Sequence, residues 1–282
     1  MARRLLAGGF AVAVWNRSAG KTAALAGAGA HVAATVAEAV AQADVVMSIV
    51  SDGPAVALAI EAALPALRAG TLWVDMSSTR QSEAQQFDAT LRAHGCAFID
   101  APVSGGVGGA VAGTLAIMAG GEADDVARAT PALAAMGRVT HVGPAGSGQV
   151  AKLCNQLIVG GTLNIVAEAL LLAQAAGASP AAVRDAIRGG FAESRILDVH
   201  GQRMLERNFL PGGQVKTQLK DMENILAAAA AAGVALPLAS LVTERYASIA
   251  GDLPHADHAA ALLALERLNP GHRVGTADDQ LP

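Results

Sequence analysis

The sequence predicts an α/β protein in which a doubly wound parallel sheet is followed by an all-α domain. Short apolar strands alternate with helical segments in the first half, which is the pattern of repeated βαβ units. From about residue 148 the strand signals stop, and the rest is helical with breaks at glycine and proline. We therefore expect one domain at residues 1–145 and a second at residues 146–282.

The predicted strands are apolar runs bounded by turn residues. The clearest is 45–50, which lies between Asp44 and a Ser-Asp-Gly-Pro turn and suits a strand buried on both faces. The expected strands are 10–15, 45–50, 71–75, 97–100, 115–119 and 139–142. The expected helices of the first half are 21–26, 38–42, 54–67 and 82–94, and a long helix at 149–176 opens the second. The tail after Asn269 is polar and expected to be loose.

The composition sets limits on the class of protein. The 282 residues are 52% hydrophobic and 16% charged, enough for a sizeable core, and the net charge is −4. Because no run of Lys or Arg occurs, we expect neither a nucleic-acid nor a membrane partner. Cys96 and Cys154 lack metal-ligand spacing, so a reduced, cytoplasmic setting is expected. The apolar stretch 157–178 contains Asn164, Glu168 and Gln174, which indicates a buried helix and not a membrane span.

A sheet of the Rossmann type normally opens with a strand, a Gly-x-Gly-x-x-Gly turn and a helix whose N-terminus holds a pyrophosphate. That spacing occurs nowhere in the sequence, although residues 2–9 resemble the end of such a helix. The pattern therefore starts about 15 residues too late. We expect an N-terminally truncated Rossmann sheet that lacks its first strand, either because Met1 is a misassigned start or because the strand is lost. A real loss predicts a poorly folded or inactive chain.

Two segments carry candidate chemistry. In residues 100–106 a serine and two glycines follow a strand. Such a turn lets backbone N–H groups approach an anion closely. The alternative is a flexible surface turn with the same composition. Residues 146–156 open the long helix and place Lys152 and Asn155 on one face. A lysine in an apolar stretch suits proton transfer, since burial lowers the pKa of an ammonium group. A solvated surface lysine is the alternative.

Taken together and in this order, these segments resemble the β-hydroxyacid dehydrogenase family. The likeness extends over essentially the whole chain and includes residues 74–78, 113–121 and 220–221. Segments 186–190, 207–212 and 256–258 are similar to members that reduce tartronate semialdehyde, also called 2-hydroxy-3-oxopropionate.

The resemblance implies a role for each matching position. Lys152 would be the catalytic acid/base and Asn155 would orient the substrate, while a substrate carboxylate would bind Ser104, Gly105 and Gly106. The positions implied beside an NAD(P) cofactor are Val50, Ser51, Ser78 and Lys220. No metal ligand is implied: His255 and His258 are three apart without an evident carboxylate partner, and His200 is given no role.

The segment Asn16, Arg17 and Ser18 follows the strand whose end normally meets the adenosine ribose. An acidic residue there suits NAD, whereas Arg17 can pair with the 2′-phosphate of NADP. A turn with Ser18 as N-cap is the alternative. We therefore expect NADP as the preferred cofactor and NAD as the other candidate.

The expected function is reduction of a small carboxylated aldehyde, tartronate semialdehyde to glycerate, or the reverse oxidation of a 3-hydroxy acid. A dehydrogenase of 3-hydroxyisobutyrate or another 3-hydroxy acid is the second interpretation. A third, of another class, is a truncated, non-catalytic homologue that only oligomerises. The apolar second half and the resemblance both favour a homodimer or homotetramer.

Overall fold

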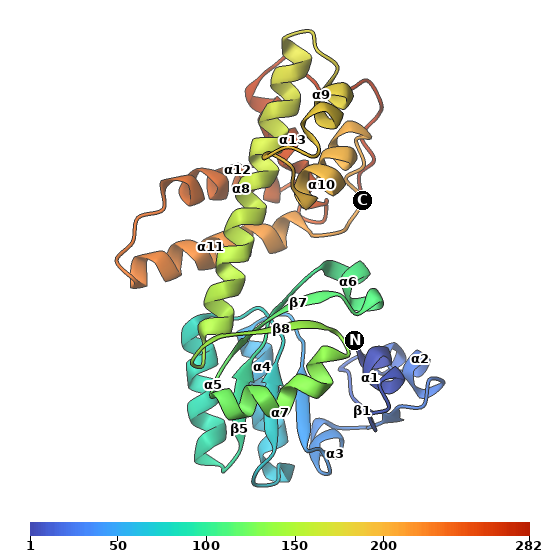
Figure 1. Cartoon of the computed structure of the whole chain (residues 1–282), viewed down its shortest axis with the longest axis vertical. Helices are drawn as coiled ribbons and strands as arrows, with labels where there is room; N and C mark the ends of the chain where they lie inside the picture. The colour runs from blue at the N-terminus through green and yellow to red at the C-terminus, as the bar shows by residue number, and fades with distance from the viewer. The chain divides into compact units, whose positions relative to one another are not determined.

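The computed structural model describes residues 1–282, the side chain of residue 19 excepted. The chain divides into two compact units, Met1–Lys152 and Leu153–Pro282. The first is α/β and the second is helical, so the fold class is as predicted (Figure 1).

Unit 1 alternates strands and helices. Its strands are β1 (Ala13–Val14), β2 (His31–Val32), β3 (Val45–Ser48), β4 (Leu72–Asp75), β5 (Ala97–Asp100), β6 (Val103–Ser104), β7 (Leu115–Gly120) and β8 (Gly137–Gly143). Its helices are α1 (Ala2–Ala7), η1 (Ala19–Lys21), α2 (Ala23–Ala26), α3 (Val36–Val40), α4 (Gly53–Ala63), η2 (Leu64–Ala66), α5 (Gln81–Ala93), α6 (Gly106–Ala112) and α7 (Ala123–Ala134).

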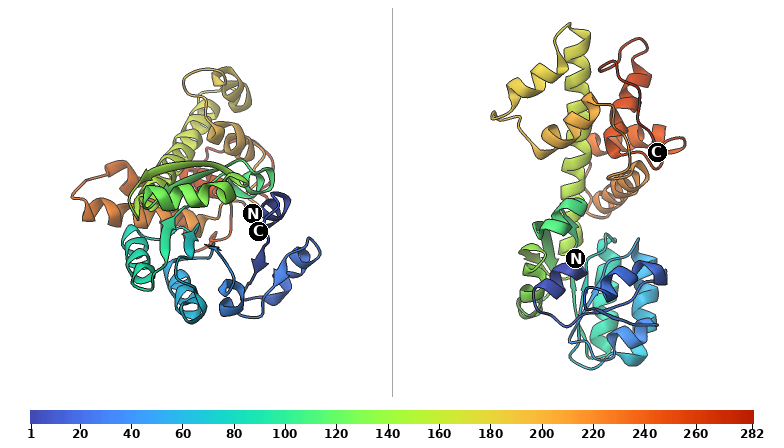
Figure 2. Two further views of the ribbon diagram at one scale, coloured as in Figure 1. Left: turned by 60° about the horizontal axis from the view of Figure 1, so that its bottom comes forward. Right: turned by 90° about the vertical axis from the view of Figure 1, so that its right-hand side faces the viewer.

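The strands form two sheets. β1 and β2 pair in parallel as a two-stranded sheet, set apart from the others (Figure 2). The larger sheet has the order β3-β4-β5-β7-β6, with β8 paired to β7. β3, β4 and β5 are parallel, with Ser48, Asp75 and Asp100 in register at their carboxyl ends.

The expectation of a wholly parallel sheet is wrong at one place. β7 runs antiparallel to β5 and to β6, so the sheet is mixed. The reason is the connection: β6 runs in the same direction as β5, and the short helix α6 that follows it reverses the chain before β7 begins. Of the strand predicted at 10–15, only Ala13–Val14 pairs, because β2 offers a partner for those two residues alone.

Helices cover both faces of the larger sheet. Trp73 and Phe98 pack against Ile60 of α4 and Phe87 of α5, whereas Val74 and Ile99 pack in the cluster that contains α7. Consecutive residues along β4, and likewise along β5, thus pack on opposite faces of the sheet, because side chains alternate between the two faces along a strand. α1 lies on the α7 side, where Arg4 Nε donates to the carbonyl of Ala135 at 3.1 Å.

Unit 2 is built on helix α8 (Ser147–Ala175), which begins in unit 1 and continues into unit 2. The other helices are α9 (Pro180–Ile187), α10 (Arg195–Leu205), α11 (Val215–Ala231), α12 (Pro237–Ala250), η3 (His258–Ala260) and α13 (Ala261–Leu268). By length and composition α8 could cross a membrane, but core helices pass the same test, and 44% of its most apolar window is buried. Leu163, Val166 and Leu170 of α8 belong to the core of unit 2.

The expectation of a loose C-terminal tail is wrong. Val274 is fully buried, and the N–H of Phe209 donates to the carbonyl of Gln280 at 2.9 Å. Arg207, itself 1% exposed, donates to both oxygens of Glu266 at 2.9 and 2.8 Å and also pairs with Asp279. A buried guanidinium needs several acceptors, and here the tail supplies some of them.

Candidate functional site

Hydroxyl groups and a carboxylate gather at the carboxyl ends of β3 and β4. Asp75 is fully buried, and its Oδ1 accepts from Ser48 Oγ at 2.8 Å and from Ser77 Oγ at 2.7 Å. Ser77 Oγ in turn accepts the N–H of Val50 at 2.9 Å. Burial raises the pKa of Asp75 above its usual value, the hydrogen bonds opposing this in part. The network fixes the loop of Val50 and Ser51, both exposed, to the loop after β4.

Gln149, in the first turn of α8, joins that helix to the loop after β4. Its Oε1 accepts the N–H of Thr79 at 3.0 Å and its Nε2 donates to the carbonyl of Ser77 at 2.9 Å. Ser78, half-buried, lies between these two anchored residues. A buried amide with both ends bonded holds its loop rigidly, since either bond would be costly to lose.

Asp100 joins the same helix turn to β5. Its Oδ1 accepts the N–H of Gly146 at 2.7 Å and its Oδ2 accepts the N–H of Gln149 at 2.8 Å. These N–H groups lie at the helix start, where no intrahelical acceptor exists for them. Burial raises the pKa of Asp100 to about 6, while the two backbone N–H groups pull it down. The carboxylate is therefore charged at neutral pH and caps α8.

Two glycines permit this close packing. A Cβ on Gly148 would lie 2.4 Å from the carbonyl oxygen of Met118 and 2.6 Å from that of Asp100. A Cβ on Gly120 would lie 2.6 Å from the N atom of Gly148. Both positions exclude any side chain, so the start of α8 lies directly on the ends of β5 and β7.

The predicted carboxylate-binding turn follows β5 closely. Ser104 is half-buried at the end of β6, in register with Ala116 of β7. Gly105 and Gly106 are exposed and have φ of 133° and 62°, values that favour glycine. The turn is thus exposed backbone with a hydroxyl beside it, held by the sheet on one side.

Lys152 is half-buried on α8, one turn beyond Gly148 and Gln149. Because the hydrogen bonds of Asp100 fix the first turn of α8, they also fix the position of the Lys152 backbone on the next turn. Lys152 is the last residue of unit 1, the unit that also holds Ser78 and Ser104.

Asn155 and Lys220 belong to unit 2 and share one polar chain there. Asn155 Nδ2 donates to Gln156 Oε1 at 2.8 Å, and Gln156 Nε2 donates to Asp221 Oδ2 at 2.7 Å. Lys220 Nζ lies 3.6 Å from the other oxygen of Asp221. The two predicted residues are therefore linked through Gln156 and Asp221.

Asn16, Arg17 and Ser18 follow β1 as an exposed turn. Ser18 donates its N–H to Asn16 Oδ1 at 2.9 Å, which is an Asx turn. Ser18 directly precedes η1, and Thr22 occupies the N-cap position of α2, the helix that follows. Arg17 is exposed.

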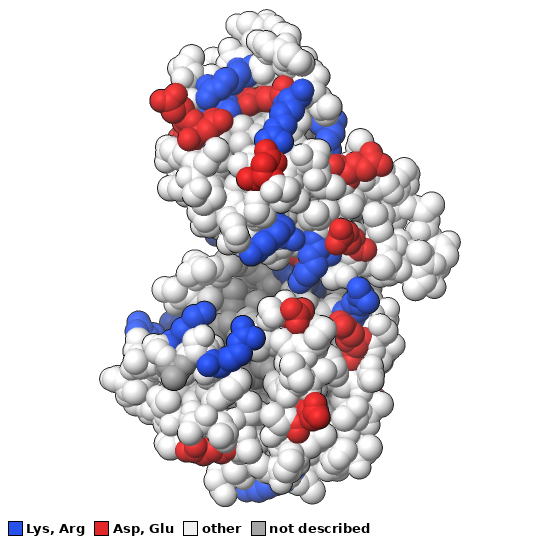
Figure 3. All heavy atoms as spheres, turned by 180° about the vertical axis from the view of Figure 1, so that it is seen from behind, with Lys and Arg blue, Asp and Glu red and all other residues white. Residues whose placement is uncertain are grey.

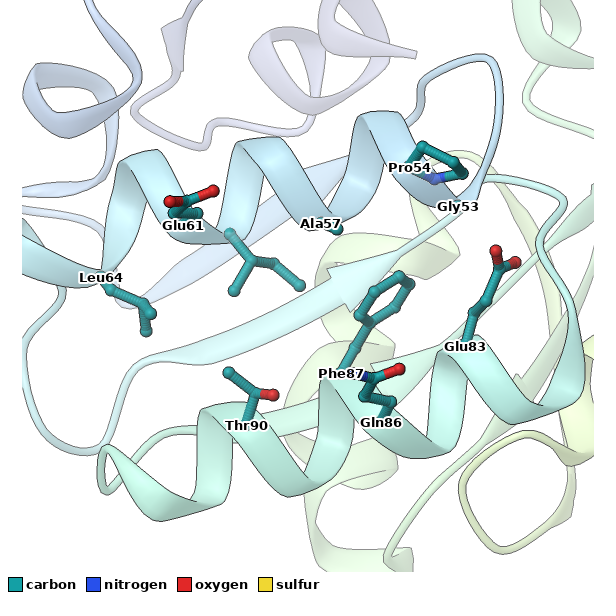
Figure 4. A pocket seen from close by; sticks show the side chains of 10 residues that line it. Gly53, Pro54, Ala57, Glu61, Leu64, Glu83, Gln86, Phe87 and Thr90 are labelled. Carbon is teal, nitrogen blue, oxygen red and sulfur yellow. The ribbon is translucent and has the colours of Figure 1, made fainter.

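A groove of 360 Å³ between α4 and α5 holds none of the predicted site residues (Figure 4). Ile60 and Phe87 line it, and Glu83 points from α5 toward Gly53 at the start of α4. Glu83 accepts the N–H of Arg80 at 2.8 Å, so its carboxylate caps α5. We interpret the groove as a packing gap between the two helices.

Comparison with known proteins agrees with this geometry. Residues 1–143 match the family described as NAD binding domain of 6-phosphogluconate dehydrogenase. Residues 146–265 match the family described as NAD-binding of NADP-dependent 3-hydroxyisobutyrate dehydrogenase. A probable 3-hydroxyisobutyrate dehydrogenase-like protein of Arabidopsis thaliana is 39% identical over 95% of this chain and 82% of its own length. The chain belongs to the β-hydroxyacid dehydrogenase family.

Further relatives place this β-hydroxyacid dehydrogenase among enzymes with different substrates. The 2-hydroxy-3-oxopropionate reductase of Escherichia coli is 42% identical over 73% of this chain and 70% of its own length. The structure of Mycobacterium tuberculosis 3-hydroxyisobutyrate dehydrogenase with L-serine has a TM-score of 0.85 and 32% identity, and 94% of each chain is covered. The family is a nicotinamide-dependent one, but these matches do not distinguish its substrates.

The residues of this dehydrogenase fit part of a nicotinamide cofactor. The loops after β3 and β4 present the Val50–Ser51 backbone and Ser78 at the carboxyl ends of parallel strands, where such ligands bind in doubly wound sheets. No Gly-x-Gly-x-x-Gly turn occurs in residues 1–282, so we assign no residue of this chain to the pyrophosphate.

Two positioning residues of this dehydrogenase were not predicted from its sequence. Asp100 was recognised only as the start of the Ser-Gly-Gly segment, and Gln149 only as part of the helix start. A carboxylate at a strand end and a glutamine just after Gly-Ser-Gly are weak signals alone, because their partners lie 46 and 70 residues away in the sequence.

Proposed function

We propose that this β-hydroxyacid dehydrogenase reduces 2-hydroxy-3-oxopropionate, a small carboxylated aldehyde, to glycerate, with Lys152 as the proton donor. The observation that carries the proposal is the clamp at the start of α8. Asp100 and Gln149 hold one helix turn against the end of β5, which leads to Ser104, and against the loop of Ser78; Lys152 follows on the next turn. Candidate groups for the substrate, the cofactor and the proton thus depend on one rigid junction.

The substrate carboxylate would bind the turn at Ser104, Gly105 and Gly106. Exposed backbone N–H groups at positive φ and a hydroxyl beside them suit an anion. Binding there fixes the substrate by the end that does not react, which leaves the aldehyde carbon free for reduction. The L-serine bound by the Mycobacterium tuberculosis relative is likewise a small carboxylated 3-hydroxy compound, which supports this class of substrate.

A bound nicotinamide cofactor would supply or accept the hydride. The part of this chain is to polarise the aldehyde oxygen and donate a proton to it, for which the ammonium of Lys152 is suited. In the reverse direction the neutral amine would accept the proton of the alcohol. Asn155, three residues later on the same helix face, would orient the substrate.

Oxidation of 3-hydroxyisobutyrate or another 3-hydroxy acid is the second candidate reaction. The Arabidopsis relative, which carries the 3-hydroxyisobutyrate dehydrogenase name, covers 95% of this chain, and this coverage favours it. Initial rates with 2-hydroxy-3-oxopropionate and with 3-hydroxyisobutyrate, each measured with both cofactors, separate the two. A kcat/KM at least tenfold higher for 3-hydroxyisobutyrate would reject the first assignment.

The role of Lys152 is tested by Lys152→Ala, with Lys216→Ala as a matched control at an exposed lysine. We expect turnover to fall by about 100-fold or more in the first variant, with the Kd for cofactor unchanged, and to stay near wild type in the second. Near-normal turnover in Lys152→Ala would remove it from the mechanism. Failure of the unmodified chain to bind NADP or NAD would favour a non-catalytic homologue.

We also propose NADP as the preferred cofactor and a homo-oligomer as the working form in a cytoplasmic setting. Arg17 is exposed after β1, where it could pair with a 2′-phosphate.

The proposed homo-oligomer has a candidate interface on α8. Ile158, Ile165 and Leu172 repeat every seven residues along this helix and are 56–70% exposed, an apolar stripe that a second copy could cover. On the face in Figure 3, acidic and basic side chains are mixed and wide areas carry neither. Sedimentation of the full chain would give the mass of the particle in solution, and hence the number of copies in it.

A further inference from the structure

Two histidines that the sequence analysis left without a role meet in unit 2. His200 lies on α10 and His258 begins η3, 58 residues later. Their Nε2 atoms are 3.3 Å apart. The ring centroids are 4.6 Å apart and the planes make 77°, so the rings meet at an angle rather than end to end. The expectation that His258 lacks a carboxylate neighbour is wrong, because ligand atoms of His200, Asp257 and His258 lie within 4.8 Å of one another.

The other ring nitrogen of His258 faces an acceptor whose orientation is fixed. His258 Nδ1 lies 3.3 Å from Gln218 Oε1. Gln218 is turned this way because its Nε2 donates to the carbonyl of Gln156, at 3.4 Å. An amide oxygen only accepts, so the Nδ1 of His258 carries the proton and its Nε2 carries a lone pair.

The other ring nitrogen of His200 lies near a carboxylate but makes no hydrogen bond to it. His200 Nδ1 lies 3.4 Å from Asp257 Oδ1. That carboxylate is 1% exposed and fixed in place, because Oδ1 accepts the N–H of Ala259 at 3.0 Å and Oδ2 accepts that of Gly213 at 3.1 Å. A nitrogen lone pair facing a fixed carboxylate is repelled, so a proton on Nδ1 suits His200 as well.

These two assignments leave one lone pair on each Nε2, and the two nitrogens lie 3.3 Å apart. Two lone pairs 3.3 Å apart repel each other, and a positive charge between them would relieve this. We propose that a transition-metal ion of the zinc class binds between the Nε2 atoms of His200 and His258. Water would occupy its remaining coordination positions.

The geometry suits such an ion. A metal 2.0–2.1 Å from each imidazole nitrogen with tetrahedral angles separates the two nitrogens by about 3.3 Å. Imidazole ligands favour zinc, copper, nickel and cobalt over magnesium or calcium. Ligating histidines usually donate their second N–H to a carboxylate or carbonyl, and Gln218 Oε1 takes that place for His258. For His200 the nearest such group is Asp257, at 3.4 Å.

Solvent reaches the histidine pair, but the surroundings limit its affinity for an ion. The side chain of His200 is 17% exposed, and Gly213 has no Cβ, which would otherwise lie 2.8–3.1 Å from three ring atoms of His258. Arg203 Nε lies 3.6 Å from Asp257 Oδ1 and shares that negative charge. With two protein ligands and a nearby guanidinium, we expect weaker binding than in a four-ligand structural zinc site.

The test is titration of the full chain, first stripped with chelator, with Co²⁺ followed by its visible absorption. We expect one equivalent to bind, with a ligand-field band that Zn²⁺ abolishes by competition. His200→Asn and His258→Asn should each weaken Co²⁺ binding at least tenfold. His31→Asn is the matched control, since His31 is exposed and 3.2 Å from the carboxylate of Glu38. It should bind as wild type does.

A second variant keeps the test decisive if a histidine replacement unfolds the chain. Gln218→Leu leaves both ligands in place but removes the acceptor that orients His258, and should weaken Co²⁺ binding about tenfold. The proposal is overturned if saturating Co²⁺ gives no band with the wild type, in which case a proton bridges the pair. It is also overturned if Co²⁺ binds the folded histidine variants, or Gln218→Leu, as tightly as the wild type.

Discussion

Asp100 Oδ2 accepts the N–H of Gln149 at 2.8 Å, so the last residue of β5 caps the first turn of α8. A buried carboxylate at a helix N-terminus satisfies donors that the helix cannot, and its charge is stabilised by the helix dipole. The bond joins the strand that leads to the Ser-Gly-Gly turn to the helix that carries Lys152. Proton transfer and substrate binding in this dehydrogenase should therefore depend on a residue that need not touch the substrate.

Gly148→Ala should disrupt this junction. Its Cβ would lie 2.4 Å from the carbonyl oxygen of Met118 and 2.6 Å from that of Asp100, and backbone atoms cannot move aside cheaply. We expect a loss of unfolding free energy of about 2 kcal/mol or more, and a fall in turnover, measured by urea denaturation and initial rates.

Gly108→Ala is the matched control. Gly108 lies in α6 and has a normal helical backbone, and a Cβ added there would have no atom within 4 Å. Its replacement should stabilise the protein slightly, by about 0.5–1 kcal/mol. Equal effects of the two alanines would contradict the close approach of α8 to the sheet.

Arg207→Ala should be among the most destabilising single changes in unit 2. The guanidinium is 1% exposed and bonds Glu266, Asp279 and the carbonyl of Val274, so its removal leaves the carboxylate of Glu266, 12% exposed, without its cation. We expect a loss of about 3–5 kcal/mol in the free energy of unfolding.

The control for Arg207 is Arg267→Ala. Arg267 and its partner Asp252 are 46% and 59% exposed, so solvent screens the pair and its loss should cost below about 1 kcal/mol. If the two replacements proved equally mild, the tail would not be held by Arg207.

Local patterns were enough to predict the elements that carry the site. β5 (Ala97–Asp100) matches its prediction residue for residue, because an apolar run there ends at a charged residue before proline. α8 begins two residues earlier than expected, since Ser147 and Gly148 join the helix only once Asp100 caps it. The Ser104–Gly106 turn lies where the sequence placed it, directly after β5 and β6.

Features that depend on distant partners were not predictable from the sequence. α6 is built largely of glycine, alanine and valine, a composition without helical signal, so the reversal that makes β7 antiparallel was missed. The pairing of His200 with His258 needs the packing of α10 against η3, and no spacing in the sequence encodes it. The burial of the tail likewise depends on Arg207, 67 residues before Val274.

Arg17→Asp should change the cofactor preference of the proposed enzyme. A carboxylate after β1 repels a 2′-phosphate but can accept a hydrogen bond from a 2′-hydroxyl. We expect kcat/KM for NADPH to fall by about tenfold or more relative to NADH. Arg3→Asp, which replaces another exposed arginine of unit 1, should leave the ratio unchanged. A preference for NADH in the unmodified protein would reject the NADP proposal.

The free energy of unfolding of unit 1 should depend on pH through Asp100, whose pKa is raised to about 6 in the folded protein. As pH rises from 4, the unfolded chain releases this proton first, so the contribution of Asp100 to unfolding free energy falls until pH passes its folded pKa. A pKa raised from 3.8 to about 6 corresponds to roughly 3 kcal/mol of unfolding free energy. In Asp100→Asn the group cannot titrate, so the wild-type stability relative to this variant should fall by about that amount between pH 4 and pH 7, measured by urea denaturation. The amide also places an N–H against one of the two helix donors, so turnover of the variant should be low at every pH. A stability difference that does not vary with pH would mean that Asp100 titrates like a solvated carboxylate and does not lie buried beneath α8.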